Sequence, residues 1–120
     1  MVETEQEIKQ RLMKFFGTLN DETRLSIILC LTKKSKTVQD IHNCIGKNKI
    51  SLSAISHQLS HLNNIGIVEF EKKGREKHFR LSDKFCWCIL KNAQKHFKDK
   101  EGCPACRKMK KSYNKKTHSK

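Results

Sequence analysis

The chain lacks any apolar run that approaches the roughly 20 residues of a membrane-spanning helix. Its first residues include Glu3, Glu5 and Glu7, which is not the pattern of a secretory signal peptide. Proteins that bind membrane surfaces typically have a basic amphipathic helix with an aromatic-rich face. This sequence shows no such helix. We therefore expect a cytoplasmic protein with no membrane partner.

Acidic residues are scarce relative to basic ones. The 120 residues include 26 Lys and Arg but only 12 Asp and Glu, which gives a formal net charge of +14. An excess of this size attracts phosphate backbones, so nucleic acid is the expected partner. A chain of 120 residues is long enough for one hydrophobic core. We assign residues 1–98 to a single domain and residues 99–120 to a basic, flexible tail.

The stretch from Ser51 to Gly66 contains no carboxylate. At 3.6 residues per turn one side is apolar and predicts a core-facing stripe: Leu52, Ile55, Leu59 and Leu62. The other side carries short hydrogen-bonding side chains: Ser53, Ser56, His57, Ser60, Asn63 and Asn64. This pattern predicts a helix with one face on the core and the other open to a polyanionic partner.

Three helices are expected before this stretch. The first covers residues 4–19, and the second follows Asn20 as its N-cap. The third starts at Thr37, has Asp40 at the capping-box position, and ends at Gly46. Only residues 47–50 separate Gly46 from a helix that begins at Ser51. Two helices joined by such a short turn are typical of a helix-turn-helix.

After Gly66 the apolar period changes from 3.6 to 2, which predicts a β-hairpin with a basic turn over residues 72–75. Ser82 and Asp83 are expected to begin a last helix that runs to about Lys98. That helix is apolar nearly all round over residues 85–90, so we expect it to pack against a second subunit.

This order of elements is mainly α with a β-hairpin wing, that is, a winged helix-turn-helix. A helix fits the DNA major groove, about 12 Å wide, where side chains near its N-terminus reach base edges. The candidate DNA-binding residues are Ser51, Ser53, Ser56, His57, Gln58, His61, Lys72, Lys73 and Arg75. Gln58 suits a bidentate contact to adenine. Taken singly, a solvated helix face and an ordinary exposed turn are alternative interpretations.

Residues 51–82, SLSAISHQLSHLNNIGIVEFEKKGREKHFRLS, resemble the recognition helix and wing of the ArsR/SmtB metal-sensing repressors. NDETRLSIILCL at residues 20–31 resembles the start of their second helix. The resemblance covers about residues 8–98. It implies a homodimeric repressor, with the first and last helices at the dimer interface, that leaves an inverted-repeat operator when an inducer binds. No enzymatic activity is expected, and DNA binding needs no cofactor.

The resemblance also implies positions for metal ligands. Where the arsenic and cadmium sensors have Cys-Val-Cys-Asp, this chain has Thr37, Val38, Gln39 and Asp40, so both thiolates are missing. The zinc-type ligand positions match Asp83, Phe85, His96 and Asp99, of which Phe85 cannot ligate. Two antiparallel helices would pair Asp83 of one copy with His96 and Asp99 of the other. Alternatively, Asp83 is a first-turn acid and His96 a surface residue.

The six cysteines are expected to be thiols or metal ligands, because disulfides are rare in cytosolic proteins. Cys103 and Cys106 form a CxxC pair that suits zinc or another soft divalent metal. Cys86 or Cys88 would add a ligand, but not both, since residues two apart on a helix point in different directions. A disulfide switch at the CxxC pair, or thiols without an effector role, are alternatives.

Cys30 and Cys44 lie in apolar helical contexts and are expected to be small core residues.

The preferred hypothesis is a dimeric repressor whose affinity for double-stranded DNA is lowered by a metal ion or a thiol-reactive signal. The alternative is a winged-helix DNA-binding protein with no small-molecule effector. A thiol oxidoreductase that uses Cys103 and Cys106 is a third hypothesis, but neither a βαβ context nor a catalytic base accompanies the pair.

Overall fold

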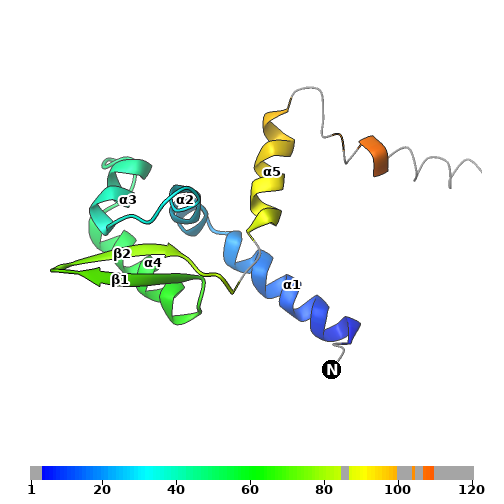
Figure 1. Cartoon of the computed structure of the whole chain (residues 1–120), viewed down its shortest axis with the longest axis horizontal. Coiled ribbons are helices and arrows are strands. Elements are labelled where there is room, and N and C mark those ends of the chain that lie inside the picture. The colour runs from blue at the N-terminus through cyan, green and yellow to red at the C-terminus, as the bar shows by residue number, and fades with distance from the viewer. Residues whose placement is uncertain (1–3, 85–86, 100–103, 105–106, 110–120) are drawn as a thin grey trace, which may run out of the picture. The chain divides into compact units, whose positions relative to one another are not determined.

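The computed structural model describes residues 4–84, 87–99, 104 and 107–109. The chain divides into two units, residues 1–84 and 85–120, and each is described by itself. Its elements are α1 (Glu5–Leu19), α2 (Glu22–Cys30), α3 (Val38–Ile45), α4 (Leu52–Asn64), β1 (Val68–Lys73), β2 (Glu76–Leu81) and α5 (Cys88–Lys98) (Figure 1). This order, with an antiparallel hairpin after four helices, is the predicted one. Within the described ranges, no helix is long and apolar enough to cross a membrane.

The predicted caps of α3 and α4 are confirmed. Thr37 and Asp40 form a capping box in which each side chain accepts a hydrogen bond from the other residue's amide, at 3.1 and 3.2 Å. Ser51 caps α4, since its Oγ accepts a hydrogen bond from the amide of Ala54 at 3.1 Å. These local bonds satisfy amide groups that a helix start otherwise leaves without a partner. They fix where the two helices of the predicted helix-turn-helix begin.

The N-cap of α2 is Asp21, so the prediction of Asn20 was wrong by one residue. The Asp21 carboxylate accepts a hydrogen bond from the amide of Arg24 at 2.9 Å. Asn20 instead ends α1, where its amide donates to the carbonyl of Phe16 at 2.9 Å. The end of α1 and the start of α2 are at neighbouring residues. Asn20 is still the C-cap of α1, so the next residue, Asp21, is the N-cap of α2.

The core of the first unit lies where α2, α3 and α4 meet the base of the hairpin. The largest apolar side chains that are fully buried come from these elements: Ile27, Ile28, Ile41, Ile55, Leu59, Leu62 and Val68. Burial of such a side chain typically contributes about 1.5–3 kcal/mol, so the three from α4 hold that helix firmly. Leu52 was expected on the same stripe but is 41% exposed, because it is the first residue of α4 and only partly covered.

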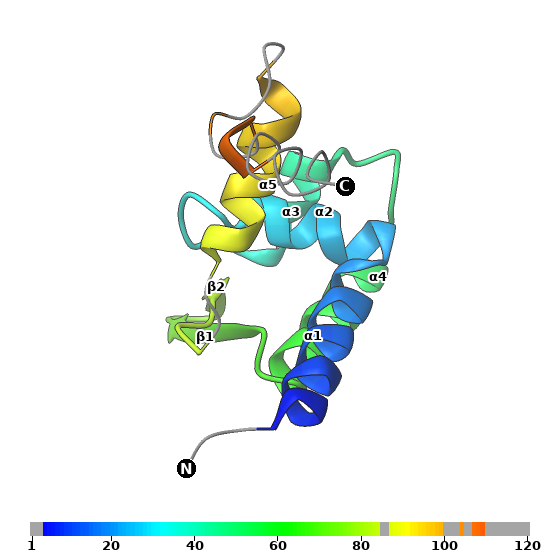
Figure 2. The ribbon, with the colours of Figure 1, turned by 90° about the vertical axis from the view of Figure 1, so that its right-hand side faces the viewer.

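The hairpin extends away from this core. β1 and β2 pair with Val68 opposite Leu81 and Lys73 opposite Glu76, which leaves Gly74 and Arg75 as the turn. Gly74 has a φ of 65°, a conformation that glycine adopts without steric cost. The exposed fraction rises from 1% at Val68 to 38% at Phe70, two residues nearer the turn. Figure 2 shows the hairpin from a second direction, at the side of the helices of the first unit. The turn therefore lies outside the core, as a wing.

Ser82 belongs to the base of the hairpin, and the prediction that Ser82 and Asp83 begin the last helix was wrong. Ser82 is 1% exposed, and its hydroxyl donates to the Glu69 carboxylate at 3.2 Å. The same hydroxyl accepts a hydrogen bond from the amide of Lys84 at 3.2 Å. The Ser82 amide also donates to the carbonyl of Ile67 at 2.9 Å, which holds this residue on the hairpin, and α5 begins only at Cys88.

The last helix, α5, leaves two of its apolar side chains exposed in the single chain. Leu90 is its buried residue, whereas Ile89 and Phe97 are 44% and 85% exposed. Its last turn carries Lys95, His96 and Lys98, which suits the negative end of the helix dipole. Phe85 and Cys86, which contributed to the prediction of a helix that is apolar all round, lie outside the described residues.

Candidate nucleic-acid interface

The side of α4 that faces away from the core carries only short polar side chains. Its exposed residues are Ser53, Ser56, His57, Ser60, His61 and Asn64. No residue from Leu52 to Asn64 is acidic, so this side presents hydrogen-bond donors and acceptors without negative charge. We call Ser53, Ser56 and His57, which lie in the first two turns, the reading face. Ser51 is exposed next to it, but its Oγ is engaged by the cap and lies 3.3 Å from the Oγ of Ser53.

Gln58 departs from the expectation for a DNA-reading residue. It is only half exposed, and its Oε1 atom is buried with no hydrogen-bond partner in the part of the chain that the structure describes. A bidentate contact to adenine needs both the amide oxygen and the amide nitrogen at the surface. In this conformation Gln58 does not present its oxygen, so the reading face relies on the three residues named above.

The start of α4 is held by α3. The Nε2 atom of His42 lies 2.9 Å from the carbonyl oxygen of Ile50, directly before the Ser51 cap. α3 ends at Gly46, whose φ of 116° turns the chain toward α4. The reading face is therefore oriented by a contact from the preceding helix as well as by the buried stripe of α4.

The capping box at the start of α3 has an electrostatic consequence. The Thr37 backbone amide donates to the Asp40 carboxylate, and this bond, reinforced by the Thr37 side chain, holds the pKa of Asp40 below its ordinary value of 3.8. Hydrogen bonds to the charged form favour that form. Asp40 is therefore ionised at neutral pH and is occupied by the helix start.

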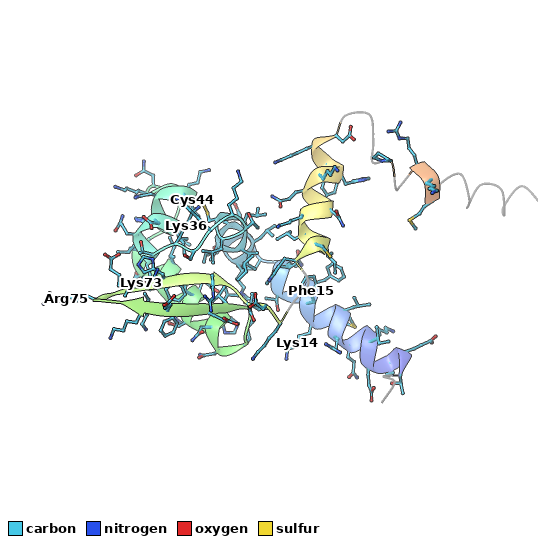
Figure 3. All side chains as sticks on the ribbon, in the orientation of Figure 1. Lys14, Phe15, Lys36, Cys44, Lys73 and Arg75 are labelled. Atoms are coloured by element: carbon cyan, nitrogen blue, oxygen red, sulfur yellow. A yellow bond between two sulfur atoms is a disulfide. The ribbon has the colours of Figure 1, made fainter. Side chains whose placement is uncertain are left out.

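The wing tip is basic and exposed. Lys72, Lys73 and Arg75 all lie on the surface, and Figure 3 shows Lys73 and Arg75 toward the far end of the hairpin. Lys72 lies directly opposite Lys77 in the strand register. Like charges in that position repel each other. The ammonium group of Lys77 lies 4.5 Å from the centre of the Phe70 ring. The attraction between this cation and the ring partly offsets the repulsion between the two lysines. An anion bound at the tip would relieve the repulsion.

Lys77 was not among the predicted DNA-binding residues. The length of the turn would have pointed to this residue. With a two-residue turn at Gly74 and Arg75, Lys77 lies opposite Lys72 and so joins the cations near the tip of the hairpin. The four cations Lys72, Lys73, Arg75 and Lys77 are called the wing cations below.

The zinc-type ligands Asp83, His96 and Asp99 were expected to meet between two copies of the chain, and this set stays a prediction. Among residues 4–84, 87–99, 104 and 107–109, no group of three or more His, Cys, Asp or Glu side chains could hold a metal ion. Asp83 is exposed in the turn after β2, in the first unit. His96 and Asp99 belong to the second unit, where the His96 ring packs against Phe97 at 5.3 Å and Asp99 is the C-cap of α5. Since Asp83 precedes α5, these ligands do not share one helix.

The predicted thiol ligands are mostly outside the description. Cys88 is exposed at the start of α5. Cys86, Cys103 and Cys106 lie outside the described residues, so the CxxC pair stays a prediction.

Cys30 and Cys44 form a disulfide, which the sequence did not predict. Cys30 is the last residue of α2, and Cys44 lies near the end of α3, with 6.3 Å between their Cα atoms. The expectation that both are small core thiols was wrong, because Cys30 is buried but Cys44 is exposed. The packing of α2 on α3 brings them together, and sequence spacing alone does not reveal it.

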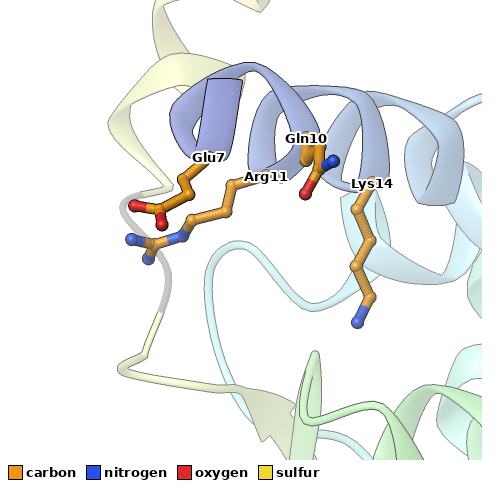
Figure 4. A pocket seen from close by; sticks show the side chains of 4 residues that line it. All are labelled: Glu7, Gln10, Arg11 and Lys14. Atoms are coloured by element: carbon orange, nitrogen blue, oxygen red, sulfur yellow. The ribbon is translucent and has the colours of Figure 1, made fainter. Parts of the chain in front are cut away.

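A shallow hollow on α1 carries no catalytic grouping. It is lined by Glu7, Gln10, Arg11 and Lys14, which all project from one side of this helix (Figure 4). None of the four is a nucleophile paired with a base. The hollow is a polar surface feature of α1.

Two comparisons with known protein sequences identify the family. Residues 21–69, from the start of α2 into β1, match the bacterial regulatory proteins of the arsR family. A cadmium resistance transcriptional regulatory protein CadC homolog of Staphylococcus aureus is 31% identical over 84 residues, which cover 69% of this chain and 67% of that protein. The chain belongs to the ArsR family. A transcriptional repressor SmtB homolog of Synechocystis sp. is 27% identical over 92 residues, 77% of this chain and 67% of that protein.

Solved structures agree with this assignment. The solution structure of apo-NmtR has a TM-score of 0.68 and 27% identity, and the match covers 80% of this chain and 78% of that one. The homodimeric winged helix-turn-helix DNA-binding domain of Mb0332 from Mycobacterium bovis has a TM-score of 0.62 and 19% identity, with 78% and 84% covered. The second likeness concerns the fold alone. The prediction of an ArsR-type winged-helix transcriptional regulator is confirmed.

Proposed function

We propose that this ArsR-family regulator is a cytoplasmic, homodimeric repressor that binds an inverted-repeat operator in double-stranded DNA. The observation that carries the proposal is the reading face, which is exposed, polar and free of carboxylates, together with the basic wing cations on the same unit. The reading face enters the major groove, where serine and histidine side chains bond base edges or phosphates. The wing cations neutralise phosphates beside the groove or in the minor groove.

Self-association is supported by the outer face of α1. Apolar side chains there are exposed in the single chain: Ile8, Leu12, Met13 and Phe16 are 46–65% exposed. A row of this kind favours burial against another surface. A relative of the same fold is described as homodimeric. A twofold dimer through the first and last helices presents two reading faces, so its operator has two half-sites about one helical turn apart.

We further propose that a metal ion or a thiol-reactive signal lowers the affinity for the operator. The relatives include a protein named for cadmium resistance. Three of the four zinc-type positions carry a possible ligand, Asp83, His96 and Asp99, whereas Phe85 does not fit. Cys103 and Cys106, with Cys86 or Cys88, offer a second possible donor set for zinc or another soft divalent metal. The alternative is a regulator that binds DNA without a small-molecule effector.

Selection from a pool of 30-base-pair duplexes with randomised centres tests the DNA-binding proposal. The expected result is enrichment of an inverted repeat that binds more tightly than a scrambled duplex at the same salt concentration. Ser56→Ala should weaken binding to the selected duplex by about 1–3 kcal/mol if its hydroxyl reads a base. Ser60→Ala is the matched control, since it removes the same group one turn further along α4 and should change affinity less. Equal binding of selected and scrambled duplexes by the wild type would refute sequence-specific recognition.

Titration of the protein complex with the selected duplex separates the effector proposal from its alternative. Zinc, cadmium and arsenite are each added to the complex, and the fraction of bound DNA is followed by fluorescence anisotropy. Release by one of them supports a metal or thiol-reactive signal. Unchanged affinity with all three, in protein kept reduced and free of chelator, supports the effector-independent regulator instead.

A further inference from the structure

The disulfide between Cys30 and Cys44 lies next to the elements that orient the reading face. Cys44 is on α3, the helix whose His42 contacts Ile50 just before the Ser51 cap. The bridge thus joins α2 to the helix that positions α4.

The surroundings of Cys44 favour chemical exchange. Cys44 is exposed, so a small thiol can reach its sulfur, whereas Cys30 is buried. The ammonium group of Lys36 lies 3.7 Å from the Cys44 Sγ (Figure 3). A neighbouring cation stabilises a thiolate and makes a cysteine more reactive. The sulfur of Cys44 can therefore be reached by a small thiol, and Lys36 stabilises the Cys44 thiolate when it leaves. The sulfur of Cys30 is buried and cannot be reached in this way.

Lys36 also connects this site to the wing. Its amide donates to the carbonyl of Phe79 at 2.9 Å, and its carbonyl accepts from the Phe79 amide at 2.8 Å. The cation beside Cys44 is thus fixed to β2, while Cys44 itself is fixed to α3. The site thus links α3, which holds the start of α4 through His42, to β2 of the wing.

We propose that Cys30 and Cys44 form a reversible dithiol–disulfide switch, and that the bridged form is the one that holds the reading face for DNA. The inference rests on the proposed DNA-binding function. Reduction frees α3 from α2, so the start of α4 is held less firmly and DNA affinity falls. The exposed reading face of the bridged structure is consistent with binding in that form.

The reductant is a small dithiol. One of its thiolates attacks the Cys44 sulfur, which forms a mixed disulfide and expels Cys30 as a thiolate that takes up a proton. The second thiolate then attacks the sulfur of the reductant, which closes a cyclic disulfide and expels Cys44 as a thiolate beside Lys36. The dithiol loses two electrons and two protons. The protein gains both electrons and one proton, at Cys30, and the other proton passes to the solvent. A cyclic disulfide of the same compound reverses both steps.

Peptide mapping of the full chain tests the bridge without DNA. Trypsin separates the cysteines, since residues 25–33 contain Cys30 and residues 37–47 contain Cys44. After equilibration with oxidised dithiothreitol, these two peptides should be linked, and after reduced dithiothreitol both should be alkylated. Alkylation of Cys44 in the reduced chain should slow several-fold in Lys36→Gln but not in the control Lys33→Gln. Unlinked peptides under oxidising conditions, or equal rates in the two variants, would overturn the proposal.

DNA affinity tests the switch itself. The probe is the selected duplex, with the scrambled duplex as a reference. Reduction should weaken binding to the selected duplex about fivefold or more, which is the range of ordinary allosteric coupling. Cys44→Ser changes an exposed residue, should bind like the reduced chain, and should not respond to dithiothreitol. Equal affinity of the bridged and reduced chains, or tighter binding after reduction, would overturn the switch.

A failure of the proposed function gives a different result. If no duplex is selected by either form, DNA recognition is refuted, and hydrogen exchange then decides the switch. Amides of α3 should exchange faster after reduction if the bridge restrains this helix. Unchanged exchange in α3 would refute the coupling even where the peptide mapping finds the bridge.

Discussion

Neutralising the wing should weaken DNA binding while it leaves the free protein folded. The perturbation is the triple variant Lys72→Gln, Lys73→Gln and Arg75→Gln. All three side chains are exposed on the hairpin, beyond the buried part of β1 and β2. The variant also removes the repulsion between Lys72 and Lys77, which lie directly opposite each other. It removes the attraction between Lys73 and Glu76 as well, since these two residues also lie opposite each other, so its effect on stability should be small.

The magnitudes follow from these positions. Each cation that neutralises a phosphate contributes about 0.9 to the slope of log affinity against log salt concentration. Three cations in each protomer correspond to a loss of about 2.7 in the slope per protomer, and about 5.4 in a dimer, if every one contacts a phosphate. The lost Lys72–Lys77 repulsion and the lost Lys73–Glu76 attraction are each worth about 0.2–1 kcal/mol, so they should largely cancel in the free energy of unfolding.

Fluorescence anisotropy with the selected duplex at several salt concentrations measures the slope, and urea unfolding measures stability. The matched control is Lys72→Arg, Lys73→Arg and Arg75→Lys, which keeps the charges and should keep the slope. A triple glutamine variant that unfolds normally and retains the wild-type slope would refute the placement of phosphates at the wing. A loss of slope together with a free energy of unfolding lower by more than about 1 kcal/mol, the size of one cross-strand pair, would point to damage to the hairpin rather than to lost phosphate contacts.

Two further predictions concern the helix starts. Ser51→Ala should lower the free energy of unfolding by about 1 kcal/mol, because the cap to Ala54 is lost, whereas Ser60→Ala should change it by less than about 0.5 kcal/mol in urea titrations. Since the pKa of Asp40 is lowered in the folded chain, its stabilising contribution is complete above its ordinary value of 3.8 and is lost as the pH falls through the lowered value. The difference in unfolding free energy between the wild type and Asp40→Asn should thus be present at pH 7 and shrink in urea titrations below pH 3.8; a difference that does not vary with pH would contradict this assignment.

Features that depend on nearby residues could be predicted from the sequence. The Thr37–Asp40 capping box and the Ser51 cap each join residues three apart, so the signal lies within one helical turn. The polar side of α4 and the presence of the hairpin follow from periodicity in the same way. The predicted turn over residues 72–75 was wrong, because the paired strands continue to Lys73 and resume at Glu76. These local signals were enough to place the reading face and most of the wing cations.

Features that depend on tertiary packing could not be predicted in this way. Ser82 has the residue type of a helix cap, but its hydroxyl bonds Glu69, which is 13 positions away. Cys30 and Cys44 are separated by 14 positions and meet only because α2 packs on α3. Gln58 has the side chain of a base reader, but half of it is turned into the protein. For Ser82 and the two cysteines, a contact with a residue more than ten positions away decides the outcome, and for Gln58 it is burial of the amide oxygen.

The attachments of α4 explain why its polar side is available for a ligand. Ile55, Leu59 and Leu62 fix the helix on the core, and Ser51 satisfies its start. The contact of His42 with Ile50 sets its approach from α3. None of these attachments uses Ser56 or His57. The exposed side of α4 therefore does not contribute to holding the helix in place. Substitutions there should therefore change DNA affinity with little effect on stability, whereas a change at His42 should affect both.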